Sequence, residues 1–124
     1  MEIKKFHETL IKKMDAYVHF VYALAKSFPS HELFGVTSQM RRATLSIILN
    51  YIEGYARRKP AVVLNFYEIS YGSLKESKYL LYFSYKEGYI DEKDYKKGFS
   101  MVDEIGAMLW KKIEALDTLR NAHN

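Results

Sequence analysis

Five cations in one short segment are the residues of this sequence best suited to bind an anion. They are Arg41, Arg42, Arg57, Arg58 and Lys59. Between positions 33 and 67 the only acid is Glu53, so this segment has a net charge of +4, and the remaining chain, with 14 cations and 14 acids, is neutral. Arginine forms paired hydrogen bonds with phosphate or carboxylate groups. The segment therefore permits an anionic partner without requiring one, and nucleic acid is one such partner.

The two ends of this segment differ in how well helix formation alone explains their charge. Arg57, Arg58 and Lys59 are expected at the C-terminus of a helix, where the helix dipole stabilises cations. Arg41 and Arg42 are expected near the first turn of the same helix, where cations are mildly unfavourable. They are therefore the stronger candidates for a functional role.

A polar stripe along the same helix is a second candidate site. At about 100° per residue its members fall within roughly 60° of one line; they are Gln39, Arg42, Ser46, Asn50, Glu53 and Arg57. The other side of the helix is apolar over more than half of its circumference, so we expect the stripe or part of the apolar arc to contact another subunit. Gly54, beside the stripe, would allow close helix approach. A solvent-exposed outer face is the alternative for the stripe.

The remaining chemistry-bearing residues do not assemble into a recognisable catalytic or metal-binding motif. The chain has no cysteine, which excludes disulfides, thiolate zinc sites and cysteine nucleophiles. Asp15 and His19 are four residues apart, but two ligands do not make a metal site. No phosphate-binding glycine loop occurs, and Ser73 has no base that the sequence identifies. We therefore predict a non-enzymatic protein with no cofactor and no metal.

Four amphipathic helices must position these residues. The expected helices span Ile3–Ser27, Thr37 or Ser38 to Lys59, Ala61–Lys86, and a fourth stretch capped by Asp91. Phe28-Pro29, Pro60 and Gly88 separate them, because proline and glycine interrupt helices. Four long helices with short connections predict an all-α, up-down-up-down antiparallel four-helix bundle, with residues 1–124 forming a single domain.

The third expected helix combines a predicted core face with many tyrosines. Its core residues are expected to be Val62, Phe66, Ile69, Leu74 and Leu81. Six of the 11 tyrosines of the chain fall between positions 67 and 89. Tyrosines beside lysines can clamp single-stranded nucleic acid. Tyrosines half-buried in bundle grooves are the more frequent arrangement, and a tyrosine-rich surface also suits a protein interface.

The sequence predicts a soluble, cytoplasmic protein that does not enter a membrane. The first residues lack the apolar core of a signal peptide. The longest apolar stretch, Ala16–Ala25, is far shorter than the roughly 20 residues needed to span a bilayer.

Three segments resemble one bacterial family. They are Phe34-Gly-Val-Thr-Ser-Gln-Met-Arg-Arg-Ala-Thr-Leu-Ser-Ile, Asn50-Tyr-Ile-Glu-Gly-Tyr-Ala-Arg57 and Gly72-Ser-Leu-Lys-Glu76. Together they resemble the 23S rRNA-intervening sequence proteins, also called the S23 ribosomal protein family. The chain departs from the family pattern at Ile48 and Leu49, where a proline and a small residue are usual. The resemblance implies a four-helix bundle that assembles as a pentameric ring. Relatives in that family serve as accessory proteins of the reverse transcriptases of diversity-generating retroelements.

Two functions are therefore open. The first is an oligomeric, pentameric bundle that binds nucleic acid, RNA rather than DNA, through the five cations of residues 41–59. In this case Gln39, Ser46, Asn50, Glu53 and Gly54 would order the contacts between subunits. The alternative is a protein-interaction adaptor or scaffold, for example an accessory subunit of a reverse transcriptase.

Overall fold

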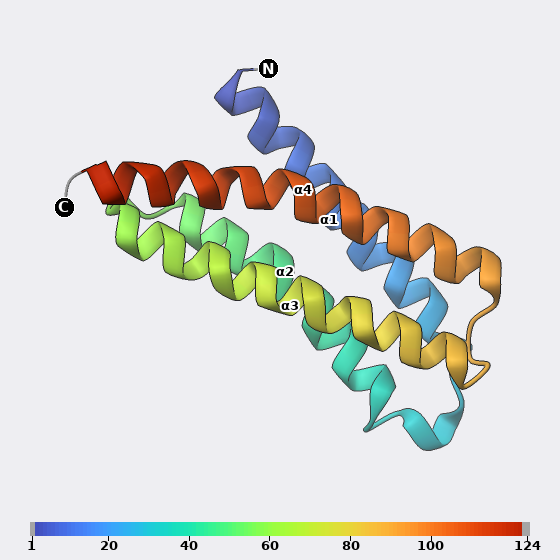
Figure 1. Cartoon of the computed structure of the whole chain (residues 1–124). Helices are drawn as coiled ribbons and strands as arrows, with labels where there is room; N and C mark the ends of the chain where they lie inside the picture. Colours follow the sequence, from blue (N-terminus) through green and yellow to red (C-terminus); the bar gives the residue numbers. More distant parts are fainter. Residues whose placement is uncertain (1, 123–124) are drawn as a thin grey trace.

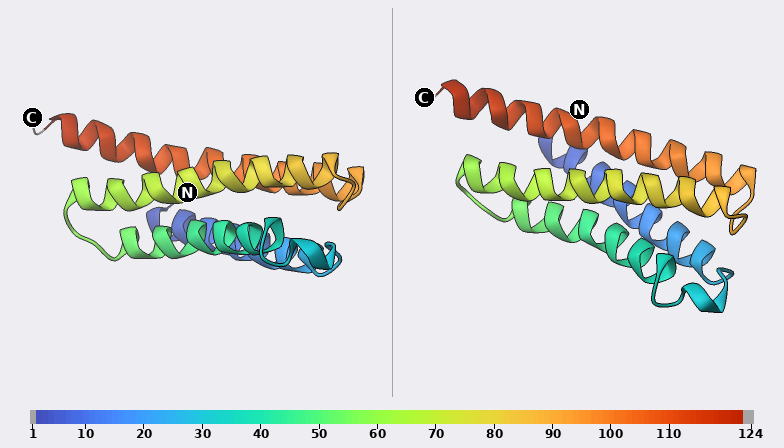
Figure 2. Two further views of the ribbon diagram at one scale, coloured as in Figure 1. Left: turned by 90° about the horizontal axis from the view of Figure 1, so that it is seen from below. Right: turned by 60° about the horizontal axis from the view of Figure 1, so that its bottom comes forward.

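Four long helices and one short 3-10 turn form the described part of the chain, residues 2–122 of a computed structural model. The helices are α1 (Ile3–Ala25), α2 (Val36–Tyr55), α3 (Pro60–Lys86) and α4 (Glu92–Ala122), and η1 (Ser30–Glu32) follows α1. Each helix packs against the next in sequence, and α4 also packs against α1 (Figure 1). The views in Figure 2 show α3 and α4 side by side in one layer and α1 and α2 in the other. The predicted all-α up-down bundle is confirmed.

The end of α2 differs from the sequence prediction. The helix stops at Tyr55 rather than near Lys59. The Arg57 N–H donates to the carbonyl of Gly54 at 3.0 Å, which tightens the last turn. Lys59 is extended (φ −77°, ψ 123°), as the residue before Pro60 must be. Arg57, Arg58 and Lys59 therefore lie in the connection between α2 and α3, and the basic patch predicted on helix two is only partly on that helix.

The other helix ends confirm some predicted caps and correct others. Gly88 has a positive φ of 79°, which permits the turn after α3. The Asp91 carboxylate accepts from the Asp94 N–H at 2.7 Å, as expected for a cap of α4. The expected start of α2 at Thr37 or Ser38 is wrong by one or two residues, because the helix begins at Val36 with Gly35 at the N-cap position. The Val36 N–H instead points to the Glu32 carboxylate at 3.5 Å.

Serines replace apolar residues on part of the inner face of α3. The buried residues of α3 are Leu64, Tyr67, Ser70, Leu74, Ser77, Leu80, Leu81 and Ser84. The predicted core residues Val62 and Ile69 are exposed, with 39% and 43% of their surface accessible. Leu74 and Leu81, also predicted as core, are buried. Apolar periodicity therefore identified only part of this face, because three of its members are serines.

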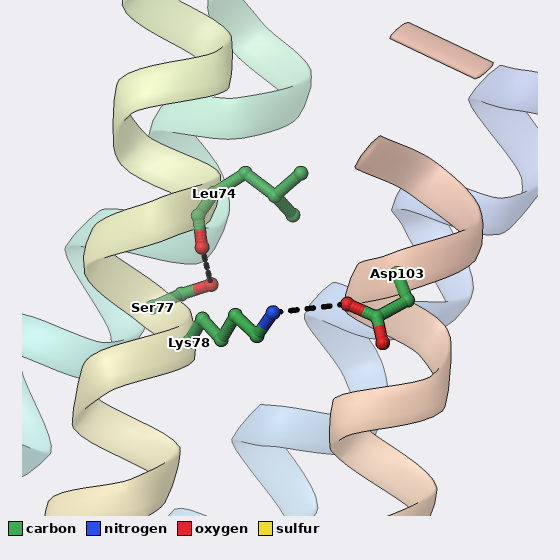
Figure 3. A network of polar contacts seen from close by, with 4 residues as sticks. All are labelled: Leu74, Ser77, Lys78 and Asp103. Atoms are coloured by element: carbon green, nitrogen blue, oxygen red, sulfur yellow. Dashed lines mark hydrogen bonds and ion pairs between the residues drawn. The ribbon is translucent and has the colours of Figure 1, made fainter. Parts of the chain in front are cut away.

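Each buried serine satisfies its hydroxyl within the bundle. Ser70 donates to the carbonyl of Ile47 on α2 at 2.6 Å. Ser77 donates to the Leu74 carbonyl at 2.7 Å (Figure 3). It also accepts a hydrogen bond from the Tyr17 hydroxyl of α1 at 3.0 Å. Small side chains with paired hydroxyls allow close helix contacts without an unsatisfied polar group.

Ion pairs between helices lie at the rim of the core. Lys78 of α3 and Asp103 of α4 are 3.1 Å apart (Figure 3), and Lys13 of α1 pairs with Glu104 of α4 at 2.7 Å. Pairs of this exposed kind contribute about 0–1 kcal/mol each. The bundle is therefore held mainly by its buried apolar side chains. Within the described helices, no stretch has the length and apolar character required to cross a membrane.

Candidate nucleic-acid interface

The five predicted site cations do not form one patch. Arg41 and Arg42 lie in the first half of α2, whereas Arg57, Arg58 and Lys59 follow its last residue. The helical stretch from Arg42 to Tyr55 is about 20 Å long. The bundle therefore places the two groups toward opposite ends.

The end of the bundle that holds Arg57, Arg58 and Lys59 also collects lysines from other helices. At this end α2 finishes, α3 begins and α4 finishes (Figure 1). The first turns of α1 join them, because His7 of α1 stacks on Tyr55. The nearer halves of the four helices, residues 2–13, 46–73 and 107–122, contain ten cations and six acids, which gives +4. Residues 14–45 and 74–106 contain nine of each. The whole net charge therefore lies at this end.

The three cations of the α2–α3 connection differ in their contacts. Arg57 pairs with Glu53 at 2.7 Å, and its guanidinium lies 5.3 Å from the centre of the Phe66 ring. Arg58 and Lys59 are exposed and belong to none of the ion pairs found in residues 2–122. They can contact an external anion without breaking an internal pair.

Arg41 and Arg42 point to different neighbours. The Arg41 guanidinium lies 5.4 Å from the centre of the Tyr22 ring of α1, and its Nε is buried without a hydrogen-bond partner. Arg42 is exposed and borders a hollow of about 300 Å³ between α2 and α3, which Glu76 also lines. Arg41 is therefore partly used in packing between helices, and Arg42 is the more accessible of the two.

The middle of the polar stripe runs along the contact with α3 of the same chain. Ser46 Oγ lies 2.7 Å from Ser73 Oγ, and Asn50 Nδ2 donates to both the carbonyl and the hydroxyl oxygen of Ser46 at 2.9 Å. Gln39 and Glu53, toward its two ends, are exposed. Ser73, considered above as a nucleophile, therefore has Ser46 as its hydroxyl partner.

Gly54 is buried against α3. A Cβ atom at this position would lie 2.8 Å from two carbons of the Tyr67 ring and 3.0 Å from the Phe66 Cβ. The close approach expected at Gly54 thus occurs inside the chain.

An apolar strip of α2 stays uncovered. Leu45, Leu49 and Ile52 are spaced by four and three residues and have 36%, 55% and 47% of their surface exposed. Met40, Ile47 and Tyr51, on the inward side, are buried. This strip of the apolar arc, and not the middle of the polar stripe, is therefore the part of α2 that the other described residues leave uncovered.

An aromatic cluster at the basic end contains a histidine and a lysine that sequence reasoning did not single out. His7 Nδ1 lies 2.8 Å from the Tyr51 hydroxyl, and the His7 ring stacks on Tyr55 with centroids 3.5 Å apart. Tyr51 stacks on Tyr67 at 5.0 Å. Lys112 of α4 lies within 5.9 Å of the centres of these three tyrosine rings. These residues are far apart in sequence, so only the packing of α1, α2, α3 and α4 reveals the cluster.

Burial controls protonation in this cluster. Burial raises the pKa of Tyr67 to about 12, and it also raises the pKa of Tyr51. Burial, followed by the nearby Lys112 ammonium, lowers the pKa of His7 below its ordinary value of 6.5, although Glu8 acts in the opposite direction. The cluster therefore favours neutral histidine beside neutral tyrosines.

Acidification is expected to weaken the fold through His7. Since the native state resists protonation of His7, the unfolded chain binds this proton first, and the free energy of unfolding falls as pH drops through about 6.5. The free energy of unfolding stops falling once the pH is below the lowered pKa of His7 in the native state. In urea unfolding, His7→Gln should lose less stability between about pH 7.5 and pH 5.5 than the unchanged protein. Equal losses in the two proteins would contradict this assignment.

Within residues 2–122, no group of three or more His, Asp and Glu side chains is arranged to hold a metal ion.

Comparison with known proteins identifies the family. No curated protein matches the chain. It is similar to the crystal structure of a protein of unknown function from the S23 ribosomal protein family of Bacteroides thetaiotaomicron, with 22% identity and a TM-score of 0.78 over 84% of this chain and 97% of that one. This similarity concerns the fold. Residues 8–111 match the family model described as 23S rRNA-intervening sequence protein, and the chain therefore belongs to that family.

Proposed function

We propose that this protein is a non-enzymatic helical bundle that self-associates and binds RNA at its basic end. The observation that carries this proposal is the separation of charge along the bundle, with +4 in the half that contains Arg57, Arg58 and Lys59 and zero in the other half. A pentamer, the assembly implied by the resemblance, would multiply this charge to about +20, enough for strong binding to phosphates that weakens with salt.

The basic end suits contacts with a nucleic-acid backbone. Arg58 and Lys59 are exposed and can reach phosphate oxygens, whose contacts position a protein without reading sequence. Tyr55, with 43% of its surface exposed, adds an aromatic side chain on which a base could stack. The family is named for 23S rRNA, which favours RNA over DNA as the proposed partner.

Self-association is proposed through the apolar strip of α2, with a second copy of this chain as the occupant. Leu45, Leu49 and Ile52 project from the same side of a long helix, which is the pattern of a helix packed against another helix. Arg57, Arg58 and Lys59, the loop cations of the α2–α3 connection, follow this strip directly in sequence. Assembly through α2 would therefore bring the basic ends of several copies near one another.

A salt titration tests RNA binding. The unchanged protein should bind a structured RNA at low salt, with an affinity that falls linearly on a log–log plot as salt increases. Changing Arg57, Arg58 and Lys59 together to glutamine should lower affinity at low salt and reduce the slope by about 2. The control changes Lys93, Lys96 and Lys97 of α4 to glutamine, which removes the same charge from the neutral half of the bundle.

The comparison of the two triple variants separates a local site from general attraction. A clearly larger loss of affinity in the Arg57, Arg58 and Lys59 variant supports the basic end as the RNA site. Equal losses would show that only net charge matters. Absence of RNA binding by the unchanged protein at low ionic strength would eliminate the proposal.

A protein-interaction adaptor is the second candidate, favoured by exposed aromatics at the neutral end. Tyr79 and Tyr82 of α3 have 61% and 45% of their surface exposed and lie near each other, with ring centroids 6.3 Å apart. Tyrosine is enriched at protein interfaces. A purified partner that is lost with Tyr79→Ser and Tyr82→Ser, but retained when the loop cations are changed, would favour the adaptor.

A further inference from the structure

We propose that a groove between α1, α3 and α4 binds a small carboxylate with an apolar body, with Lys112 as its counter-ion. The groove lies at the same basic end of the bundle, but Arg57, Arg58 and Lys59 are not among the residues that line it. It would add a small-molecule ligand to the protein.

The groove has the size and composition of a ligand site. Its volume is about 440 Å³, within the range of roughly 300–1,000 Å³ typical of small-molecule pockets. Phe6 of α1, Val63 of α3 and Leu116 of α4 contribute apolar walls, and Lys111 and Lys112 contribute the charge. None of the residues that line it is acidic. An apolar groove with two cations and no carboxylate of its own is complementary to an apolar anion.

Lys112 is held at the groove by aromatic rings. Its ammonium lies 5.2 Å from the ring centre of Tyr55, 5.6 Å from Tyr51, and 5.9 Å from both Phe6 and Tyr67. None of the ion pairs found in residues 2–122 includes Lys112. Burial lowers the pKa of this lysine. The rings compensate part of the lost hydration, but a cation surrounded by aromatic faces lacks the anion that would neutralise it.

A carboxylate in the groove would supply that anion. A charge-assisted hydrogen bond to an ammonium is about twice as strong as a neutral one, and it gains further where water is displaced. The apolar walls favour a hydrocarbon or aryl body over a polar one. A nucleotide is a poorer fit, since apart from the two lysines the only polar side chain among the lining residues is that of Tyr67.

Octanoate and octan-1-ol separate the charged and apolar contributions. Titration calorimetry should detect octanoate binding to the unchanged protein, and about 10- to 100-fold weaker binding to Lys112→Met. Methionine keeps an unbranched apolar side chain and removes the charge, so octan-1-ol should bind both proteins with similar affinity. Ala115→Phe places a ring in the groove and should weaken binding of both ligands. Lys75→Met is the control, because Lys75 lies over Tyr71 elsewhere on α3.

Two further variants keep the proposal falsifiable. Lys112→Arg keeps the positive charge, so it should bind octanoate more tightly than Lys112→Met and retain much of the affinity of the unchanged protein. The Arg57, Arg58 and Lys59 variant should bind octanoate normally, so failure of RNA binding and failure of this site are distinguishable. No octanoate binding by the unchanged protein at millimolar concentration would overturn the proposal. Undiminished binding by Lys112→Met and Ala115→Phe, each shown by circular dichroism to be folded, would also overturn it.

Discussion

Gly54→Ala is expected to destabilise the protein by about 1–3 kcal/mol, although alanine is the better helix former. The added methyl group would lie 2.8 Å from two carbons of the Tyr67 ring. That ring cannot move aside at little cost, since Tyr67 is buried and stacks on the buried Tyr51. The overlap should outweigh the gain of about 1 kcal/mol in helix propensity. Urea unfolding at fixed protein concentration measures the change, because assembly would make stability depend on concentration.

Gly72→Ala is the matched control for this prediction. Gly72 is also inside a helix, but it is exposed and no atom would lie within 4 Å of the added Cβ. Alanine there should stabilise α3 by about 0.5–1 kcal/mol. A lower free energy of unfolding in Gly54→Ala together with a higher one in Gly72→Ala would establish the close contact between α2 and α3. Equal stabilisation by both would mean that the two helices approach less closely at Gly54.

Ile52→Glu is expected to dissociate the proposed assembly into monomers. A glutamate in the middle of an apolar contact would have to lose its hydration without a partner, and this cost is several kcal/mol for each copy of the contact. The monomer itself should tolerate the change, since 47% of the Ile52 surface is exposed. Light scattering coupled to size exclusion measures the mass directly.

Ile69→Glu on α3 is the control for the apolar strip. Ile69 has 43% of its surface exposed, so the two variants introduce the same charge at positions of similar accessibility. Only Ile52→Glu should change the mass of the assembly. The proposed contact through α2 would be contradicted if the unchanged protein were a monomer. It would also be contradicted if the Ile52→Glu variant formed an assembly of the same mass as the unchanged protein.

The fold followed from local signals that the chain carries along its length. Apolar spacing, Pro29, Pro60, Gly88 and the Asp91 cap predicted four helices, and the structure has them. The errors occurred where a local rule met a tertiary constraint. Val62 and Ile69 were expected in the core, but the buried face of α3 includes Ser70, Ser77 and Ser84, whose hydroxyls bond to helix carbonyls.

The candidate site was less accessible to sequence reasoning than the fold. The surplus of positive charge between positions 33 and 67 reads as one patch when the segment is considered alone. The antiparallel bundle separates the two ends of that segment. It brings residues 2–13 and 107–122 to the end that holds Arg57, Arg58 and Lys59. Which cations act together is therefore decided by helix pairing.

The sequence by itself determined the helix number, the up-down bundle and the family, because helix periodicity, breakers and the quoted motifs are local properties. Tertiary structure alone decided that the middle of the polar stripe meets α3, that Leu49 and Ile52 stay exposed, and that His7 meets Tyr51 and Tyr55. It also placed Lys112 among four aromatic rings. These contacts join residues separated by tens of positions, and their geometry depends on how the helices cross, which no local pattern encodes.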